Sequence, residues 1–168
     1  TGKAEAAMPN RGGRFRMGIA HGSTTDTLDS GNSENHFTLI NGYTFGNHLT
    51  EVGNDGQLKG ELAESYESSD AKRWVFNLRK GVEFHNGKTL TSEDVVASFK
   101  HHMGEDSTSA AAGLLTAVNS VTADGKNRVI FDLEDSNAGF PFIVSDYHIS
   151  IRPAAVSYTH LRAHETKC

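Results

Sequence analysis

Histidine and carboxylate side chains are the groups in this chain that could do chemistry. A zinc site needs three or four ligands that converge, and neighbours such as His101 and His102 point in different directions on a helix. The chain contains no HExxH and no CxxC spacing. We therefore expect no dedicated metal site and no cofactor. The seven histidines outside the last 13 residues are scattered: His21, His36, His48, His85, His101, His102 and His148.

Nucleophilic and acid–base catalysis have little support in the sequence. No GxSxG motif is present, and no Ser, His and Asp set has a recognisable spacing. Asp132 and Glu134 lie two residues apart, which places both carboxylates on one face of a strand. Glycosidases use paired carboxylates, but charges on a solvent-facing strand are the commoner explanation. The RGGRF segment at 11–15 lacks the spacing of a phosphate-binding loop. We expect a protein that is not an enzyme.

Length and charge narrow the classes of partner. The 168 residues correspond to about one domain. The net charge of −5 argues against a nucleic-acid partner, because phosphate binding needs clustered Lys and Arg. No apolar run approaches the roughly 20 residues of a membrane-spanning helix.

The last 13 residues differ in character from the rest. VSYTHLRAHET at 156–166 matches one reading frame of a transposon-based sequencing-library adapter. We therefore expect residues 156–168 to be a non-native tail and the native sequence to stop at about Ala155. The only cysteine, Cys168, would then lie in the tail. The alternative is a native, mildly basic tail.

Local patterns predict the elements that position these side chains. Alternating apolar residues predict strands over 14–20, 74–78 and 149–151. Apolar residues at helical spacing predict helices over 36–49, 109–118 and 137–144, and another that begins at Thr91 and buries Val95, Val96, Phe99 and Met103. Turn residues predict a loop over 22–32, turns at 54–56 and 86–87, and a hairpin that turns at Asp124-Gly125. Mixed strands and helices without regular βαβ alternation indicate an α+β fold.

One block of the chain resembles a known family. GVEFHNGKTLTSEDVVASF at 81–99, with LAESYE at 62–67 and WVFNLRKG at 74–81 before it, is similar to the signature of bacterial family 5 solute-binding proteins. Asn86-Gly87 suits a tight turn, and Thr91 with Asp94 suits a helix start. We expect this signature to be structural rather than to touch ligand. Its matching positions are Gly81, Phe84, Asn86, Gly87, Leu90, Thr91, Asp94 and Val95.

The resemblance covers nearly all of residues 12–155. RGGRFRMGIAHGSTTDTLD at 11–29 resembles the family's opening strand and loop, although Ser30 stands where the family usually has Pro. Residues 121–146 resemble a later hairpin and helix. The resemblance implies a flexible lead-in at 1–13, and at 14–155 the N-terminal part of a family 5 domain. That part belongs to one lobe of a two-lobed, class II periplasmic-binding-protein-like clamp, truncated here.

The resemblance also implies a function. Family members are extracytoplasmic receptors, periplasmic, secreted or membrane-anchored, that deliver solutes to the permease of an ABC importer. We expect a monomer that captures di- or oligopeptides. Nickel chelates, opines and sugars are alternatives within the architecture. A hydrolase or metal enzyme that uses the His and carboxylate residues, or a structural or adhesive extracellular module, are alternatives outside it.

The resemblance to the family implies that three segments contact the solute, because of where they lie in the matching sequence. Hydroxyls and backbone N–H groups of the first two suit a carboxylate, and Asp146 suits an amine or another cation. His148 would suit a metal complex. The expected ligand-binding residues are Ser23, Thr24 and Thr25, then Ser109 and Ala110, then Asp146, Tyr147 and His148.

Overall fold

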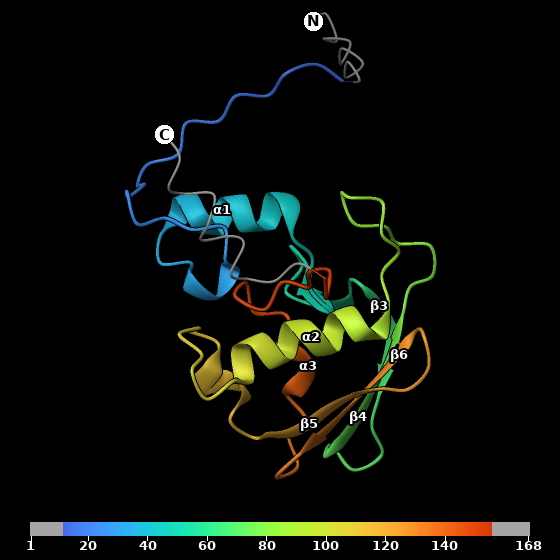
Figure 1. The fold of residues 1–168 in the computed structure, drawn as a ribbon. Helices are drawn as coiled ribbons and strands as arrows, with labels where there is room; N and C mark the ends of the chain where they lie inside the picture. The colour runs from blue at the N-terminus through green and yellow to red at the C-terminus, as the bar shows by residue number, and fades with distance from the viewer. Residues whose placement is uncertain (1–11, 156–168) are drawn as a thin grey trace, which may run out of the picture.

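A four-stranded antiparallel sheet is the larger of the two sheets in the described residues and lies at the lower right of Figure 1. The computed structural model describes residues 12–155, so the expected tail at 156–168 and nearly all of the lead-in lie outside the described residues. The strands lie in the order β3 (Ala63–Glu67), β4 (Arg73–Leu78), β6 (Arg128–Leu133) and β5 (Val118–Ala123). The predicted hairpin is therefore confirmed as β5 and β6, and the predicted strand at 74–78 as β4.

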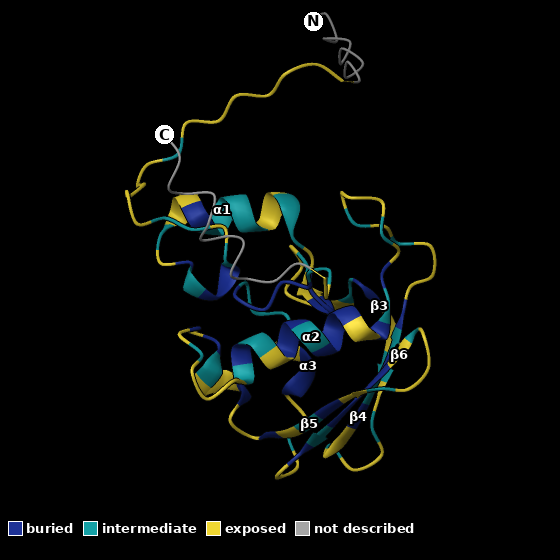
Figure 2. Ribbon diagram, in the orientation of Figure 1, coloured by how far each residue is buried: buried dark blue, intermediate teal, exposed yellow. Residues whose placement is uncertain are grey.

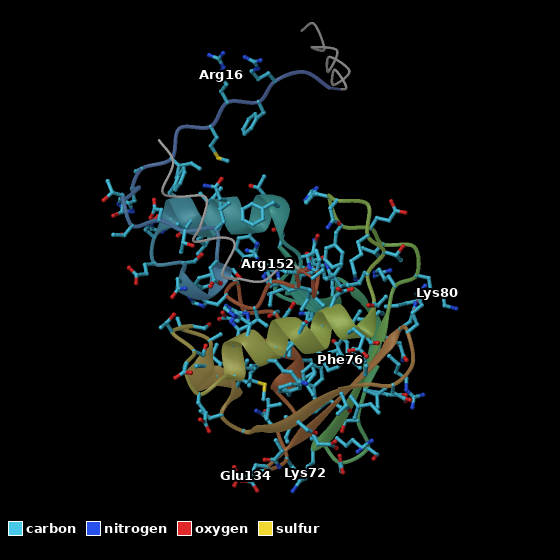
Figure 3. All side chains as sticks on the ribbon, viewed as in Figure 1. Arg16, Lys72, Phe76, Lys80, Glu134 and Arg152 are labelled. Atoms are coloured by element: carbon cyan, nitrogen blue, oxygen red, sulfur yellow. The ribbon has the colours of Figure 1, made fainter. Side chains whose placement is uncertain are left out.

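Aromatic side chains join this sheet to two helices, α2 (Ser92–Met103) and α3 (Phe140–Ile143). Phe131 of β6 lies at the centre, with its ring centroid 4.7 Å from Phe99 of α2 and 5.2 Å from Phe140 of α3. Phe76 of β4 packs edge-on to Phe131 at 5.4 Å and lies inside the molecule in Figure 3. All four of these rings are buried, so the core sits on one face of the sheet, beneath α2 and α3.

The signature block builds one corner of this core. Gly87 has a φ of 79°, in the left-handed region where Gly is favoured, and a bridge between Glu83 and Thr89 closes the turn. The buried Asp94 carboxylate accepts hydrogen bonds from the backbone N–H and the hydroxyl of Thr91, as a helix cap should. The predicted turn and helix start are both confirmed.

The remaining elements lie outside the main sheet. A two-stranded ribbon pairs β1 (Thr50–Val52) with β2 (Leu58–Gly60), and its connection contains the predicted turn at 54–56. Helix α1 (His36–Phe45) follows the short 3₁₀ helix η1 (Ser30–Asn32). Helix α1 is mostly exposed or half-buried, in contrast to the dark-blue inner face of α2 in Figure 2.

Three predicted elements are wrong. Residues 14–20 form no strand among the described residues; they run exposed along the outside, with 85% of Phe15 accessible, because no other described segment pairs with them. The helix expected at 109–118 is only the 3₁₀ helix η2 (Ala112–Leu115), and β5 begins at Val118. Residues 149–151 are buried but form no ladder.

Two predicted helices are shorter than expected. Helix α1 ends at Phe45 instead of 49, because the chain turns extended at Gly46. The helix expected at 137–144 is confirmed only as α3, with Pro141 in its first turn, a position that needs no N–H.

Candidate functional site

Three segments that are far apart in the sequence meet beside η1. The Ser30 hydroxyl donates to the His148 carbonyl at 2.8 Å and lies 2.8 Å from the Ser150 hydroxyl. The Ala110 N–H donates to the Gly31 carbonyl at 2.9 Å. These bonds bring the second and third of the expected solute-contacting segments to the end of the first loop.

Gly31 allows this close approach. A Cβ atom added there would lie 2.7 Å from the Ser109 hydroxyl oxygen and 3.2 Å from Nδ1 of His102. The first distance is shorter than real Cβ contacts, so a larger residue would push the segments apart.

The Asp26 carboxylate ties the first loop to the start of α1. One carboxylate oxygen accepts from the Ser23 N–H at 2.7 Å, and the other accepts from the Asn35 side-chain amide at 2.6 Å. Asn35 is itself the N-cap of α1 and accepts from the Phe37 and Thr38 N–H groups. The loop and the first turn of α1 are therefore held as one unit.

An open hollow lies between this unit and the segment that carries Tyr147. We call it the α1 hollow; its volume is about 330 Å³. In Figure 1 the blue loop passes the start of α1, and the red segment that includes Tyr147 lies below the helix. The hollow is lined by His21, Ser33, Glu34, Asn35, His36, Leu39 and Tyr147.

Two other hollows carry none of the expected solute-contacting residues. One, of about 140 Å³, lies along α1 against Leu28, Phe37 and Phe45. The other, of about 220 Å³, lies between Phe45 and the signature turn, where Phe84 and Asn86 form part of its wall. We take the α1 hollow as the candidate site, because an expected residue lies in its wall.

The first and second expected segments differ in exposure. Ser23, Thr24 and Thr25 are exposed in the turn that follows His21, and the Ser23 and Thr25 hydroxyls lie 2.9 Å apart. Ser109 is buried, with its hydroxyl 2.8 Å from Nδ1 of His102. The structure thus places the first segment beside the α1 hollow and turns the Ser109 side chain inward.

The third expected segment forms a compact turn. The backbone N–H and Nδ1 of His148 lie 3.0 and 2.7 Å from one oxygen of Asp146. The Tyr147 and His148 rings lie with centroids 3.9 Å apart. Asp146 therefore already has an internal partner, and Tyr147 is the member of this segment that reaches the α1 hollow.

Sequence reasoning missed His21 and His36 as site residues. Their Nδ1 atoms lie 3.2 Å apart, although the residues are separated by 15 positions. His21 has a φ of 71°, in the left-handed region that non-glycine residues rarely adopt. No local signal gives this pairing; the nearest clue is that His21 precedes the expected binding loop and His36 opens the predicted helix.

His101 and His102, which are adjacent in the sequence, have partners inside the protein. Nε2 of His101 lies 3.1 Å from the Asp29 carboxylate, and His102 is fully buried. Burial lowers the pKa of His102 to about 4, with a further lowering by His101 that Asp29 opposes. The Asp29 pKa is raised by its burial, but the contact with His101 outweighs this and holds it below the usual range. His102 is therefore a neutral core residue.

The Asp132 and Glu134 pair is structural. Asp132 lies 2.8 Å from Nη1 of Arg73 on the neighbouring strand and accepts from the Ser120 hydroxyl. Glu134 lies past the end of β6, exposed, near Lys72 at the same end of the sheet in Figure 3. Asp132 lies within β6 and Glu134 just after it, and neither lines the α1 hollow.

The described residues contain neither a cluster of metal ligands nor a membrane-spanning helix. Between residues 12 and 155, no group of three or more His, Cys, Asp or Glu side chains is arranged to hold a metal ion. In the same part of the chain, no helix has the length and apolar character needed to cross a membrane.

Comparison with known proteins gives the family. Residues 57–165 match the family described as bacterial extracellular solute-binding proteins, family 5 Middle. The oligopeptide-binding protein AppA of Bacillus subtilis is 28% identical over 140 residues, which are 82% of this chain and 25% of AppA. An uncharacterised B. subtilis protein, YhjP, is 36% identical over 128 residues, 73% of this chain and 20% of that protein. The chain thus spans about a quarter or less of these relatives.

Solved structures give the same fold. The binding protein AgaA from A. tumefaciens R10, in complex with agropinic acid, is 29% identical, with a TM-score of 0.74 over 77% of this chain and 26% of AgaA. A nickel ABC transporter structure from Bacillus halodurans is 25% identical, with a TM-score of 0.65 over 74% of this chain and 25% of that one. The expected α+β fold, part of a solute-binding protein lobe, is confirmed. The chain belongs to the bacterial extracellular solute-binding proteins of family 5.

Proposed function

We propose that this chain forms part of a receptor that captures a peptide outside the cytoplasmic membrane and delivers it to an ABC permease. The family is described as extracellular solute-binding proteins, and its relative AppA is an oligopeptide-binding protein. The proposed receptor is a monomer whose two lobes close on the solute. Closure is favoured only by the solute's greater affinity for the closed form.

The α1 hollow is the observation that carries this proposal. It opens between a loop, a helix start and the segment of Tyr147, each fixed by bonds elsewhere in the protein. Ser33, Glu34 and Asn35, which carry hydroxyl, carboxylate and amide groups, line the hollow together with Tyr147. A short peptide offers matching groups, because its amine can meet a carboxylate and its backbone can bond to hydroxyls and amides.

A metal complex is the second candidate solute. One structural relative is a nickel ABC transporter protein, and two histidines lie in the wall of the α1 hollow. An opine-like solute fits the relative that holds agropinic acid. The peptide is preferred because AppA, with the widest sequence match to this chain among these relatives, is an oligopeptide-binding protein.

Nuclear magnetic resonance on the chain tests the proposal. Di-alanine and tri-alanine, added up to about 10 mM to reveal a millimolar Kd, should shift the amide signals of Ser33, His36 and Tyr147 in a saturable way. Tyr147→Ala should weaken this binding. Phe142→Ala is the matched control, because Phe142 is also aromatic and 53% exposed but lies outside the α1 hollow. Unchanged signals around the hollow at the highest concentration would contradict the α1 hollow as the solute site.

A further inference from the structure

The two Asn-Gly dipeptides of this chain lie in different local structures. Asn41 and Gly42 are interior residues of α1, whereas Asn86 and Gly87 are exposed in the signature turn. An Asn that precedes Gly can cyclise, because the backbone nitrogen of Gly can attack the side-chain carbonyl carbon of Asn and no Cβ on the Gly obstructs the approach. Whether either site reacts depends on how the fold holds these two atoms.

A hydrogen bond prepares the Asn86 side chain for attack. Its Oδ1 accepts from the Lys88 N–H at 3.1 Å. A donor on a carbonyl oxygen stabilises the negative charge that develops there when a nucleophile adds to the carbon. The same bond folds the side chain back over the backbone that follows it, which includes the Gly87 nitrogen. Both residues are exposed, so water reaches them.

The Gly87 nitrogen is held by a bond within the turn. Its N–H donates to the Phe84 carbonyl at 2.8 Å, and this bond must open before the nitrogen can lose its proton. A Cβ atom built on Gly87 would meet no atom within 4 Å, so no other segment crowds this side of the turn. Opening an exposed turn is a local fluctuation that leaves the core packed.

Helix α1 protects the other dipeptide. The Asn41 Nδ2 group donates to the Phe37 carbonyl at 2.9 Å, which directs the amide along the preceding turn of the helix. Gly42 is an interior residue of α1, so its N–H belongs to the hydrogen-bond ladder of the helix. Asn41 can therefore cyclise only after this part of α1 has unwound.

We infer that Asn86 is a site of spontaneous covalent modification, at which the folded protein loses ammonia and becomes aspartate or isoaspartate. The Gly87 nitrogen bonds to Cγ of Asn86, and the bond from Cγ to Nδ2 breaks. The proton that Gly87 loses returns through water to the departing nitrogen, which leaves as ammonia. Water then opens the cyclic imide at either carbonyl carbon, so nothing is oxidised or reduced. The inference does not depend on the solute.

Either product changes the signature turn. Asn86 lines the hollow of about 220 Å³ together with His85 and Arg152, so the new carboxylate joins two basic side chains there. Isoaspartate also adds one carbon to the backbone of a turn in which the Phe84 N–H donates to the Lys88 carbonyl at 2.9 Å. Aspartate leaves the backbone unchanged. Isoaspartate should therefore loosen the turn, and aspartate should not.

Peptide mapping by mass spectrometry tests the inference on the full chain. The protein is incubated in mildly alkaline buffer, once folded and once in urea, and the peptides that contain Asn41 and Asn86 are followed over time. In the folded protein, Asn86 should be converted at least about tenfold faster than Asn41, because helix opening must precede the reaction of Asn41. In urea this difference should largely disappear, since neither site is then held by the fold.

Asn86→Gln is the matched control. It keeps a side-chain amide at position 86, but the longer side chain cyclises far more slowly, so the turn peptide should stay unmodified while Asn41 behaves as before. Equal rates at Asn41 and Asn86 in the folded chain would overturn the inference. Conversion of Asn86 in urea alone would overturn it as well, because the fold would then protect the turn.

Asn86→Asp separates the added charge from the added carbon. This variant carries the carboxylate on an unchanged backbone, so its Tm should stay close to that of fresh protein. Protein aged until isoaspartate has accumulated should melt at a lower temperature than Asn86→Asp. An equal Tm for the aged protein and the variant would overturn the loosening of the turn by isoaspartate.

Discussion

The sheet scaffold and the α1 region use their polar and aromatic side chains in opposite ways. By the sheet scaffold we mean β3 to β6 with α2, and by the α1 region residues 21–45. In the scaffold, Asp94 is buried and accepts from Lys88, Thr91 and the Ala154 N–H. In the α1 region, Glu34, His36 and Phe37 are exposed. The carboxylate of the scaffold is thus hydrogen-bonded inside the protein, whereas these side chains of the α1 region face solvent.

This difference separates the residues that carry the family signature from those that line the proposed site. The signature turn and helix start are recognisable because folding constrains each position. Burial raises the pKa of Asp94, for instance, but hydrogen bonds from Lys88, Ala154 and Thr91 lower it by more, so its pKa lies below the usual value. Asp94 therefore remains an ionised structural group. A strong family signature therefore says little about the ligand, for which we propose a site in the less constrained α1 region.

Truncation of Phe131 should give the largest difference in stability between the sheet scaffold and an exposed segment. Phe131 is fully buried and contacts Phe76, Phe99 and Phe140. Phe131→Ala should lower the free energy of unfolding by about 3–5 kcal/mol, through lost burial and a cavity. Phe15→Ala, at an 85% exposed ring, should change it by less than about 0.5 kcal/mol. Urea denaturation measures both, and equal losses would show that residues 14–20 are packed after all.

Acid should destabilise the scaffold through His102. Its folded pKa of about 4 lies below the ordinary value of 6.5, so between these pH values the unfolded chain binds the proton and the folded chain does not. This contribution to stability should be complete above pH 6.5 and fall by about 3 kcal/mol as pH drops to 4.

His102→Asn isolates this effect. Asn keeps a polar group near the Ser109 hydroxyl, which His102 now contacts at 2.8 Å, but does not titrate. The variant should start less stable and lose less between pH 6.5 and 4, as followed by urea denaturation at several pH values. Parallel pH curves for the two proteins would mean that His102 is protonated in the fold.

The scaffold was largely predictable from sequence because its signals are local. The Asn86-Gly87 turn, the cap of Thr91 by Asp94 and the alternation that gives β4 each depend on residues within a few positions. Local rules were sufficient wherever the partner of a residue was close in the chain.

The predictions were wrong where contacts between residues far apart in the sequence determine the local structure. Residues 14–20 alternate like a strand, but a strand needs a partner that the pattern does not supply. Ser109 looked like a helix start; instead its hydroxyl meets His102 and the next N–H bonds to Gly31. The His21–His36 pair, 15 residues apart, has the same origin. The candidate site is built from such contacts, so the sequence indicated its segments but not its geometry.

The smallest predicted effect tests backbone strain in the α1 region. His21 has a φ of 71°, whereas Gly takes such angles in the scaffold turns at residues 81, 87 and 125, and Ala71 is the other described non-glycine residue with a positive φ. His21→Gly should raise the free energy of unfolding by about 0.5–1 kcal/mol, since a left-handed residue with a Cβ is strained and Gly is not. His21→Ala keeps the Cβ and is the matched control; it should show no gain. Because the loop is exposed, differences in Tm between the two variants report strain rather than packing. A gain in stability for both variants would show instead that the contact between the His21 imidazole and His36 is destabilising. The strain in the α1 region would then lie in its side chains rather than in its backbone.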